Sequence, residues 1–432
     1  MRRPAGDSSS AGGARTASTT SRPSSSGDGC RGPQAAGMTT IIRAAAAHDL
    51  LALVPALAGF APERSIVCVA FRGSRSAGLL RHDLPRRARD RPSLVSAIVG
   101  TLCRMPGVDA VVPIAYTDRT FEGSRGLPER ALLALLVRRA EQAGFDVRDA
   151  LCRAADGWGS LLDPATPAGG HALAMIDESP AAAALPEREP VHASSTASGR
   201  LPERDVDLSA AIAAELAAFD ALEGIGAQLD RLGDLADPVA LVEALLDEPP
   251  AGAASESPTA LRLAWFLHLA ERPPVRDAMM LQFAFGPVVG AAAHDDAVET
   301  AERAERTGET VDELVRRELT DGAEGEVSEL LGRLLLGRST VRPDPGRVER
   351  ALEVSRIAAA NAPGDLHVAP LCIAAWLAWS LGRGSAAGAL IDLAVEASPG
   401  HSMATLLSAF IGSGALPEWA FVDPRSSSRR RP

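Results

Sequence analysis

The segment Asp49–Phe71 constrains the fold of this chain more than any other part of the sequence. It begins with an apolar run of helical character behind Asp49, which we expect to be the N-cap of a helix. After a turn at Gly59, the run Ser65–Phe71 is almost continuously apolar. A strand without polar alternation is typical of a sheet covered on both faces. The segment therefore predicts an α/β domain in three layers and marks where the folded part starts.

Residues 38–176 as a whole read as this α/β domain. Pro113 lies within one predicted strand and indicates an edge position or a bulge, because proline has no N–H to donate. A turn is expected around Asp156–Trp158. The order β-β-α-β-α-β predicts a mixed sheet with helices on both faces. The sequence predicts helices over 47–58, 92–105 and 129–143, and strands over 65–71, up to 84, 108–116 and 145–153.

The rest of the chain predicts a linker over 177–205, rich in Pro, Ala and Ser, and then an all-α part. Apolar residues recur there at steps of three and four, which is the helical period. We expect a helical domain over 206–345 and a helical hairpin region over 346–420. The expected helices start near Leu208 and then cover 237–247, 258–270, 274–291, 309–319, 325–336 and 346–361.

The hairpin is predicted from four residues: Gly382, Ala387, Ala394 and Pro399 have the spacing of a tetratricopeptide unit. One unit is too few for a repeat array, so it predicts a single capping hairpin.

Both ends of the chain lack an apolar period. We expect residues 1–37 to form a disordered tail, and Met38 has the character of a more natural start. At the other end, we expect residues 421–432 to form a short, disordered basic tail. The stretch Gly27–Gly32 matches G-x-G-x-x-G, but no strand precedes it and no helix follows. It therefore predicts no dinucleotide site.

Composition excludes several function classes. The net charge is −11, and all 44 basic residues are arginine, so a broad nucleic-acid footprint and any lysine-dependent chemistry are excluded. The five cysteines form no C-x-x-C pair, which indicates a reducing compartment. No apolar run approaches the ~20 residues of a membrane span. We expect a cytoplasmic protein that binds neither nucleic acid nor membrane.

The candidate ligand-binding residues are Glu63, Arg64, Asp83 and Trp158, which lie at or near strand ends of the α/β domain. Open sheets bind ligands at the carboxyl ends of their strands. Arg64 precedes its strand, which leaves open the alternative that it lies at the opposite edge.

Metal and nucleophile motifs are not found. The pair His82-Asp83 cannot converge on one ion, because neighbouring strand residues point to opposite faces. In His48-Asp49 the acid is better explained as a helix N-cap, and the triplet His294-Asp295-Asp296 follows a helix and lacks a second ligand at the four-residue step. No G-x-S-x-G sequence occurs. We predict no metal and no cofactor, and the sequence identifies no catalytic residue.

The run Asp49–Leu84, the segment Pro274–Ala278 and the stretches Ala374–Gly384 and Leu416–Trp419 together resemble a family catalogued as domain of unknown function 4192, widespread in high-GC Gram-positive bacteria. The resemblance spans most of residues 45–420. Family members carry a cysteine-containing turn where this chain has Trp158–Leu173, which contains no cysteine. The resemblance implies a fold and names no catalytic residue.

Two functions remain open from the sequence. The first is a non-catalytic interaction or regulatory protein, with the helical domain as the surface for a protein partner. The alternative is a small-molecule hydrolase or ligand-binding enzyme that uses Asp or Glu with Arg in the α/β domain. Whether the chain is an enzyme is undecided at this stage.

Overall fold

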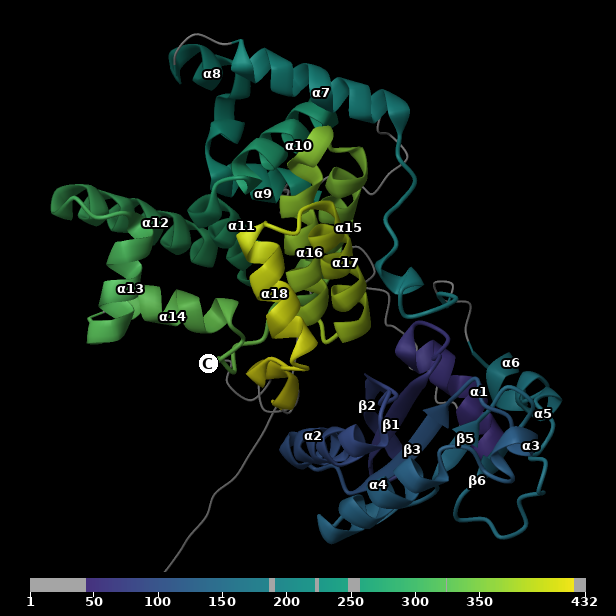
Figure 1. Ribbon diagram of the computed structural model, residues 1–432. Helices are drawn as coiled ribbons and strands as arrows, with labels where there is room; N and C mark the ends of the chain where they lie inside the picture. Colours follow the sequence, from purple (N-terminus) through teal and green to yellow (C-terminus); the bar gives the residue numbers. More distant parts are fainter. Residues whose placement is uncertain (1–43, 186–190, 222–224, 248–256, 324, 423–432) are drawn as a thin grey trace, which may run out of the picture. The chain divides into compact units, whose positions relative to one another are not determined.

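The computed structural model describes residues 44–185, 191–221, 225–247, 257–323 and 325–422 (Figure 1). The predicted tail over 1–37, the Gly27–Gly32 match and all of the basic tail beyond residue 422 lie outside these ranges. Within them an α/β part comes first and a helical part follows, as the sequence predicts.

One mixed sheet of six strands forms the centre of the α/β part. Its order is β2-β1-β3-β5-β6, and β4 also pairs with β3. β1 is antiparallel to β2 and β3, β3 is parallel to β4 and β5, and β6 is antiparallel to β5. The strands are β1 (Ser65–Arg72), β2 (Arg75–Asp83), β3 (Ala110–Tyr116), β4 (Asp146–Val147), β5 (Leu151–Arg153) and β6 (Trp158–Ser160).

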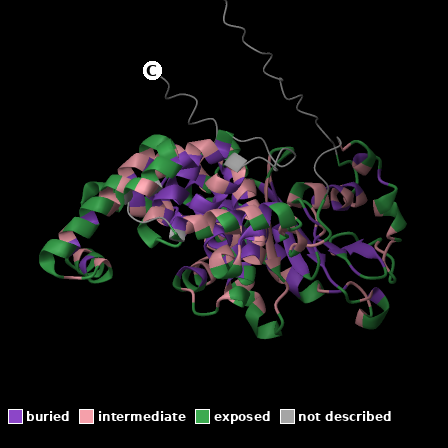
Figure 2. Cartoon of the chain, turned by 90° about the horizontal axis from the view of Figure 1, so that it is seen from above, coloured by how far each residue is buried: buried purple, intermediate pink, exposed green. Residues whose placement is uncertain are grey.

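Helices cover both faces of this sheet, which confirms the three-layer prediction. On one face, α2 (Arg91–Arg104) and α4 (Arg130–Gln142) pack on alternate residues of β1 such as Ile66 and Cys68. On the other, α1 (Ala47–Ala58) packs on Val67 and Val69. β1 and β3 are almost entirely buried between these layers, and buried strands are visible in purple in Figure 2, whereas the residues of β2 are exposed or intermediate. The continuous apolar pattern of β1 follows from this double burial.

Asp49 is not the N-cap of α1. The N-cap is Ala46, and Asp49 is the third residue of the helix. Its Oδ2 accepts the backbone N–H groups of Ala45 and Ala46 at 2.9 and 3.0 Å. An acidic side chain still satisfies the free N–H groups of the first turn, but from inside the helix.

Pro113 lies in an interior strand, so the expected edge or bulge position is wrong. β3 pairs with β4 through Ala110 and Val111, and with β5 only from Ile114 onward. Val112 and Pro113 therefore face the interruption between β4 and β5. The backbone N–H of Arg148 donates to the Val111 carbonyl, so the odd-numbered residues of β3 direct their backbone N–H and C=O groups toward β4 and β5. The missing N–H of Pro113 consequently costs no ladder hydrogen bond.

Other differences are local. The strand predicted over 145–153 is divided into β4 and β5, and β6 begins at Trp158, where a turn was expected. The helix predicted over 274–291 is two helices, because Gly286 has a φ of 95° and Pro287 begins the second one. Proline is favoured in a first helical turn and disrupts a helix interior.

The helical part buries one large apolar cluster. Its helices are α7 (Val206–Asp220), α8 (Ile225–Leu232), α9 (Pro238–Asp247), α10 (Ser257–Ala270), α11 (Pro273–Phe285), α12 (Pro287–Thr307), α13 (Val311–Asp321), α14 (Glu326–Leu335), α15 (Pro345–Asn361), α16 (Val368–Ser380), α17 (Gly384–Ala397) and α18 (Ser402–Gly412).

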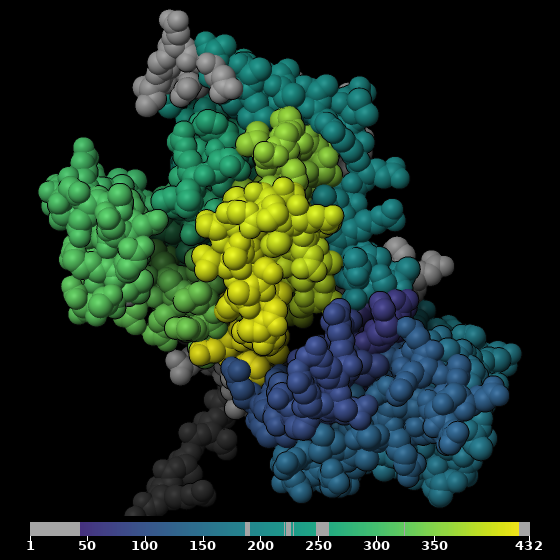
Figure 3. Space-filling view, in the orientation of Figure 1, coloured from purple at the N-terminus to yellow at the C-terminus, as the bar shows by residue number. Residues whose placement is uncertain are grey.

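The predicted hairpin is formed by α16 and α17, which are joined through Gly382 at a φ of 78°. Every residue of α16 is buried, and Ala387 and Ala394 of α17 are fully buried in the same cluster. Figure 3 shows α18, in yellow, on the surface in front of this pair. Small residues on α17 thus let the two helices of the hairpin approach closely.

The described residues of 177–205 make defined contacts. Two short helices come first, α5 (Ala174–Asp177) and α6 (Pro180–Ala183). His192 forms a β-bridge with Phe60, and a Cβ on Gly199 would lie 2.5 Å from the Cβ of Ala389. Gly199 therefore lets this segment lie directly on α17.

Candidate functional site

The most distinctive polar feature of the α/β part is a row of residues across one end of the sheet. Pairing places Asp83, Ser65, Tyr116, Arg153 and Trp158 side by side on successive strands, from β2 to β6. Directly opposed residues direct their side chains to the same face. For this row it is the face covered by α1, since Tyr116 and Trp158 belong to the apolar cluster on that side.

Three buried polar atoms in this row have no hydrogen-bond partner among the described residues. They are Ser65 Oγ, Tyr116 OH and Trp158 Nε1. Leaving such a group buried and unpaired costs about 1–3 kcal/mol, and natural structures usually avoid it. Ser65 and Tyr116 adjoin in the row, Arg153 separates Tyr116 from Trp158, and of the three only Tyr116 lines a cavity.

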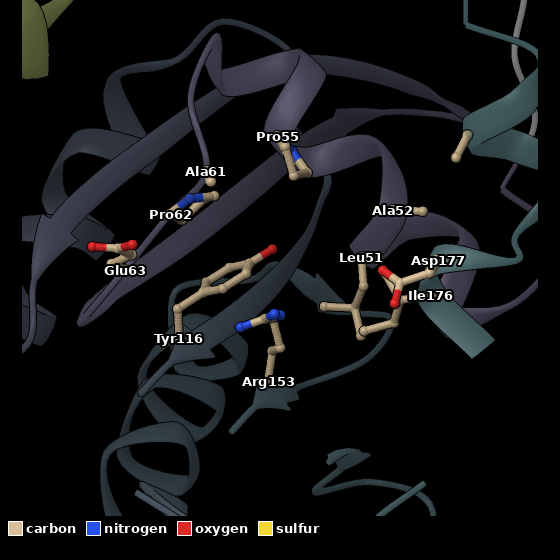
Figure 4. A pocket seen from close by; sticks show the side chains of 11 residues that line it. Leu51, Ala52, Pro55, Ala61, Pro62, Glu63, Tyr116, Arg153, Ile176 and Asp177 are labelled. Atoms are coloured by element: carbon tan, nitrogen blue, oxygen red, sulfur yellow. The ribbon is translucent and has the colours of Figure 1, made fainter. Parts of the chain in front are cut away.

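A cavity of about 440 Å³ opens above this row, between the sheet and α1 (Figure 4). This volume lies within the range of about 300–1,000 Å³ that is usual for small-molecule sites. Tyr116 and Arg153 form part of its lining from β3 and β5. The complete lining is Leu51, Ala52, Pro55, Ala61, Pro62, Glu63, Tyr116, Arg153, Ile176, Asp177 and Ala182.

Tyr116 is the central polar group of the cavity. Tyr116 is only 3% exposed, and its phenol points into the cavity, as Figure 4 shows. Burial raises the pKa of Tyr116 above its usual range, and the neighbouring Arg153 opposes part of this rise in pKa. The phenol therefore keeps its proton at neutral pH and is a hydrogen-bond donor.

Three charged side chains surround Tyr116. Arg153 is its neighbour in the sheet, and Glu63 and Asp177 lie on either side in Figure 4. All three residues are exposed, and no hydrogen bond or ion pair joins their side chains to another described residue. The remaining lining is apolar. The cavity can thus offer donors at its centre, acceptors at two sides and an apolar wall.

The wall that carries Asp177 is held by one buried hydrogen bond. Ser179 Oγ donates to Asp49 Oδ1 at 2.6 Å, which joins the α5–α6 segment to α1. This bond is the main cause of a lowered pKa at Asp49, with further lowering from the N–H groups of Ala45 and Ala46. Asp49 therefore stays ionised at neutral pH and fixes this wall of the cavity.

Comparison with known proteins places the whole described fold in one family. The profile described as domain of unknown function (DUF4192) matches residues 48–304 and 287–418. The chain belongs to the DUF4192 family. Neither the search of curated proteins nor that of solved structures found a match.

In this DUF4192 chain, the four residues predicted from the sequence share one end of the sheet. Because β1 runs antiparallel to β3, its beginning lies beside the carboxyl ends of β3 and β5. Arg64, which precedes β1, is therefore at the same edge as Asp83 and Trp158 and not at the opposite one. Only Glu63 lines the cavity.

The other three candidates have different surroundings. The Arg64 guanidinium lies 3.7 Å from Asp118, and both side chains are exposed. Asp83 pairs with Arg81 at 2.5 Å. Trp158 is buried and stacks on His171, with ring centroids 4.5 Å apart.

Sequence reasoning missed Tyr116, Arg153 and Asp177. The first two end the strands predicted over 108–116 and 145–153, so the strand-end rule that selected Asp83 applies to them equally. Tyr116 is also the only tyrosine of the chain. Asp177 had no comparable signal, because the short helix that carries it falls at the start of the predicted linker.

Within the described ranges, no three His, Cys, Asp or Glu side chains gather in a group suited to a metal ion. The same residues contain no helix that combines the length and the apolar character of a membrane span.

Proposed function

We propose that this DUF4192 chain is a regulatory protein whose α/β domain binds a small polar molecule, without catalysis, in the cavity at the end of the sheet. The observation that supports it most strongly is the phenol of Tyr116, which is buried and aimed into the cavity without a partner among the described residues. A bound ligand would supply that partner and remove the cost of the unpaired group. The unpaired guanidinium of Arg153 beside it points to an acceptor-rich ligand.

Binding is favoured over catalysis by the chemistry of the lining. It contains no Ser, Thr, Cys or His side chain. Its one hydroxyl belongs to Tyr116, whose raised pKa disfavours the phenolate that a nucleophile or general base requires. The lining thus suits recognition by donors and acceptors.

A protein partner on the helical domain completes this proposal. Leu319 of α13 and Val327 and Leu330 of α14 are each more than half exposed, and exposed apolar side chains are typical of interaction surfaces. We place the protein in the cytoplasm, which the four free cysteines among the described residues support. The net charge of −11 supports the absence of nucleic acid as a partner.

The test is a thermal-shift screen of charged metabolites, followed by calorimetric titration of each hit. A ligand of the cavity should raise the melting temperature of the wild type and bind at least about tenfold more weakly to Tyr116→Phe, which loses only the hydroxyl. The control is Arg89→Met, which removes an exposed arginine outside the cavity. Hits that bind equally to Tyr116→Phe, or an absence of hits, would refute the proposal.

A hydrolase is the second candidate, and the observation in its favour is the pair of carboxylates, Glu63 and Asp177, at two sides of the cavity. Incubation of each hit with the protein, analysed by mass spectrometry, separates the two functions. Conversion that is lost in both Glu63→Gln and Asp177→Asn would establish the enzyme. Recovery of the unchanged ligand would support binding without catalysis.

A further inference from the structure

The charges of the cavity specify more than a polar ligand. One cation, Arg153, and two anions, Glu63 and Asp177, line the same space, and neither carboxylate forms an ion pair with the guanidinium. All three charges belong to exposed residues, so each is available to pair with a charged group of a ligand. A ligand that carries both signs of charge would pair with each of them.

The donor side of the cavity suits a carboxylate. Tyr116 and Arg153 are adjacent on parallel strands and face the same way, so an O–H and the N–H groups of a guanidinium converge on one region. An arginine binds a carboxylate through two parallel hydrogen bonds, and a charged partner makes such bonds shorter and stronger. Tyr116 can donate a further bond to the same oxygen atoms.

The acceptor side suits an ammonium group on Asp177. Two residues beyond it, Ser179 is fixed to Asp49 of α1 by the buried hydrogen bond, so the backbone that carries Asp177 is held in place. Glu63 lies in the connection between α1 and β1, on the other side of Tyr116 in Figure 4, whereas Asp177 lies beside Leu51 and Ile176. A ligand whose apolar group packs on Leu51 and Ile176 therefore places an adjoining ammonium group beside Asp177, and this favours Asp177 as the ammonium partner.

Between these two sides the lining is apolar. Leu51 and Pro55 of α1 and Ile176 of α5 face the cavity in Figure 4. A ligand with charged groups alone would leave this apolar wall exposed to water. An alkyl or aryl group would bury the wall and gain roughly 25 cal/mol of binding free energy per Å² of apolar surface removed from water.

We infer that the cavity binds a zwitterion of the α-amino-acid class with an apolar side chain. Its carboxylate lies on Arg153 and Tyr116, its ammonium group on Asp177, and its side chain against Leu51 and Ile176. This inference rests on the proposed small-molecule function and names the ligand class for the same cavity.

The experiment is a calorimetric titration of the full chain with four matched probes. L-leucine and L-phenylalanine carry both charges, N-acetyl-L-leucine lacks the ammonium group, and isoamylamine lacks the carboxylate. An amino acid should bind, and removal of either charge should weaken binding at least about tenfold, as expected when a charge-assisted hydrogen bond is lost.

Variants assign each charge to its residue. Asp177→Asn should weaken leucine at least about tenfold and leave N-acetyl-L-leucine unchanged, because that probe has no ammonium group to lose. Arg153→Gln and Tyr116→Phe should weaken leucine and leave isoamylamine unchanged. The control is Asp118→Asn, an exposed acid at the same edge outside the cavity lining. Melting curves equal to wild type confirm that each variant is folded.

The outcomes separate this inference from the proposed function. If N-acetyl-L-leucine or isoamylamine binds as tightly as leucine, or if a screened ligand of another charge type binds and is lost in Tyr116→Phe, the zwitterion is refuted and the small-molecule site stands. Loss of leucine in Glu63→Gln but not in Asp177→Asn refutes the ammonium assignment. Leucine binding that is unaffected in all these variants, or no ligand from any source, refutes both.

Discussion

Replacing Asp49 with alanine tests how the cavity wall is held. The carboxylate accepts three hydrogen bonds, from Ala45 N, Ala46 N and Ser179 Oγ. The two backbone groups are exposed and regain water in the variant, so their loss resembles the removal of a helix cap, about 1 kcal/mol. Ser179 is 3% exposed, and its O–H would be left buried without an acceptor while its oxygen still accepts from the Ala181 N–H, which adds about 1–3 kcal/mol. We expect a total loss of about 2–4 kcal/mol.

Urea denaturation followed by circular dichroism measures this loss. Ser179→Ala removes the same bond between the segments together with the hydrogen bond that Ser179 Oγ accepts from the Ala181 N–H. Because Ser179→Ala and Asp49→Ala remove one shared bond, the double variant should cost less than the sum of the two single losses. The matched control is Glu313→Ala, which removes an N-terminal acid of α13 that is exposed and caps only its own helix. A loss no larger than that of the control would refute the reasoning, and so would strict additivity.

The same contact has a defined pH dependence. The hydrogen bond from Ser179 Oγ, with those from Ala45 N and Ala46 N, lowers the pKa of Asp49 in the folded state below the ordinary value of an aspartate, about 3.9. Its contribution is therefore fully present above the unfolded pKa and is lost as the pH falls through the folded pKa. The difference in stability between wild type and Asp49→Asn should be constant at neutral pH and should shrink below about pH 4. A difference that grows on acidification would contradict the lowered pKa.

Three further predictions concern the core. Val67→Asp should prevent soluble expression, because Val67 is fully buried in a doubly covered strand and a carboxylate there has no partner; a soluble variant with a cooperative melt would contradict the three-layer packing. Ala387→Leu should cost about 1–3 kcal/mol in urea denaturation by overpacking α17 against α16, whereas Ala397→Leu at an exposed position of α17 should cost little; equal midpoints would refute the hairpin contact. Among the described cysteines, a thiol reagent at neutral pH should label Cys103 alone in the folded protein, because Cys68, Cys152 and Cys372 are buried and burial raises the pKa of each to about 12. Mass spectrometry counts the labelled cysteines, and labelling of more than one of these four would contradict the prediction.

Local sequence signals predicted those elements whose pattern is set by neighbours along the chain. The apolar run of β1 and the periodic run of α4 lie within about one residue of their predicted bounds. The break between α11 and α12 also has a local signal, the Gly286-Pro287 pair, but the apolar period continues across this pair and predicts one helix. β6 has no such signal, since its three residues become a strand only by pairing with β5.

Local signals also anticipate part of the candidate site, namely the residues that adjoin strongly predicted strands. The strand-end rule selected residues at the end of the sheet where the candidate cavity lies. It could not decide at which end Arg64 lies, because strand direction is a property of the tertiary pairing. Glu63 was found because it adjoins a strong strand. Asp177 could not be found, since its place in the cavity depends on the contact between Ser179 and Asp49, which are 130 residues apart.

The antiparallel course of β1 also has a consequence for redesigning the lining of the candidate cavity. In an all-parallel sheet, only the loops that follow the strands reach the end of the sheet where ligands bind. A library of variants must then be confined to residues of those loops. Here the entry into β1, which carries Glu63, meets the exits of β3 and β5 at one edge. Combinatorial libraries can therefore randomise Glu63, Arg153 and Asp177 together as three remote chain segments, while the apolar interior of the sheet that supports them is left unchanged.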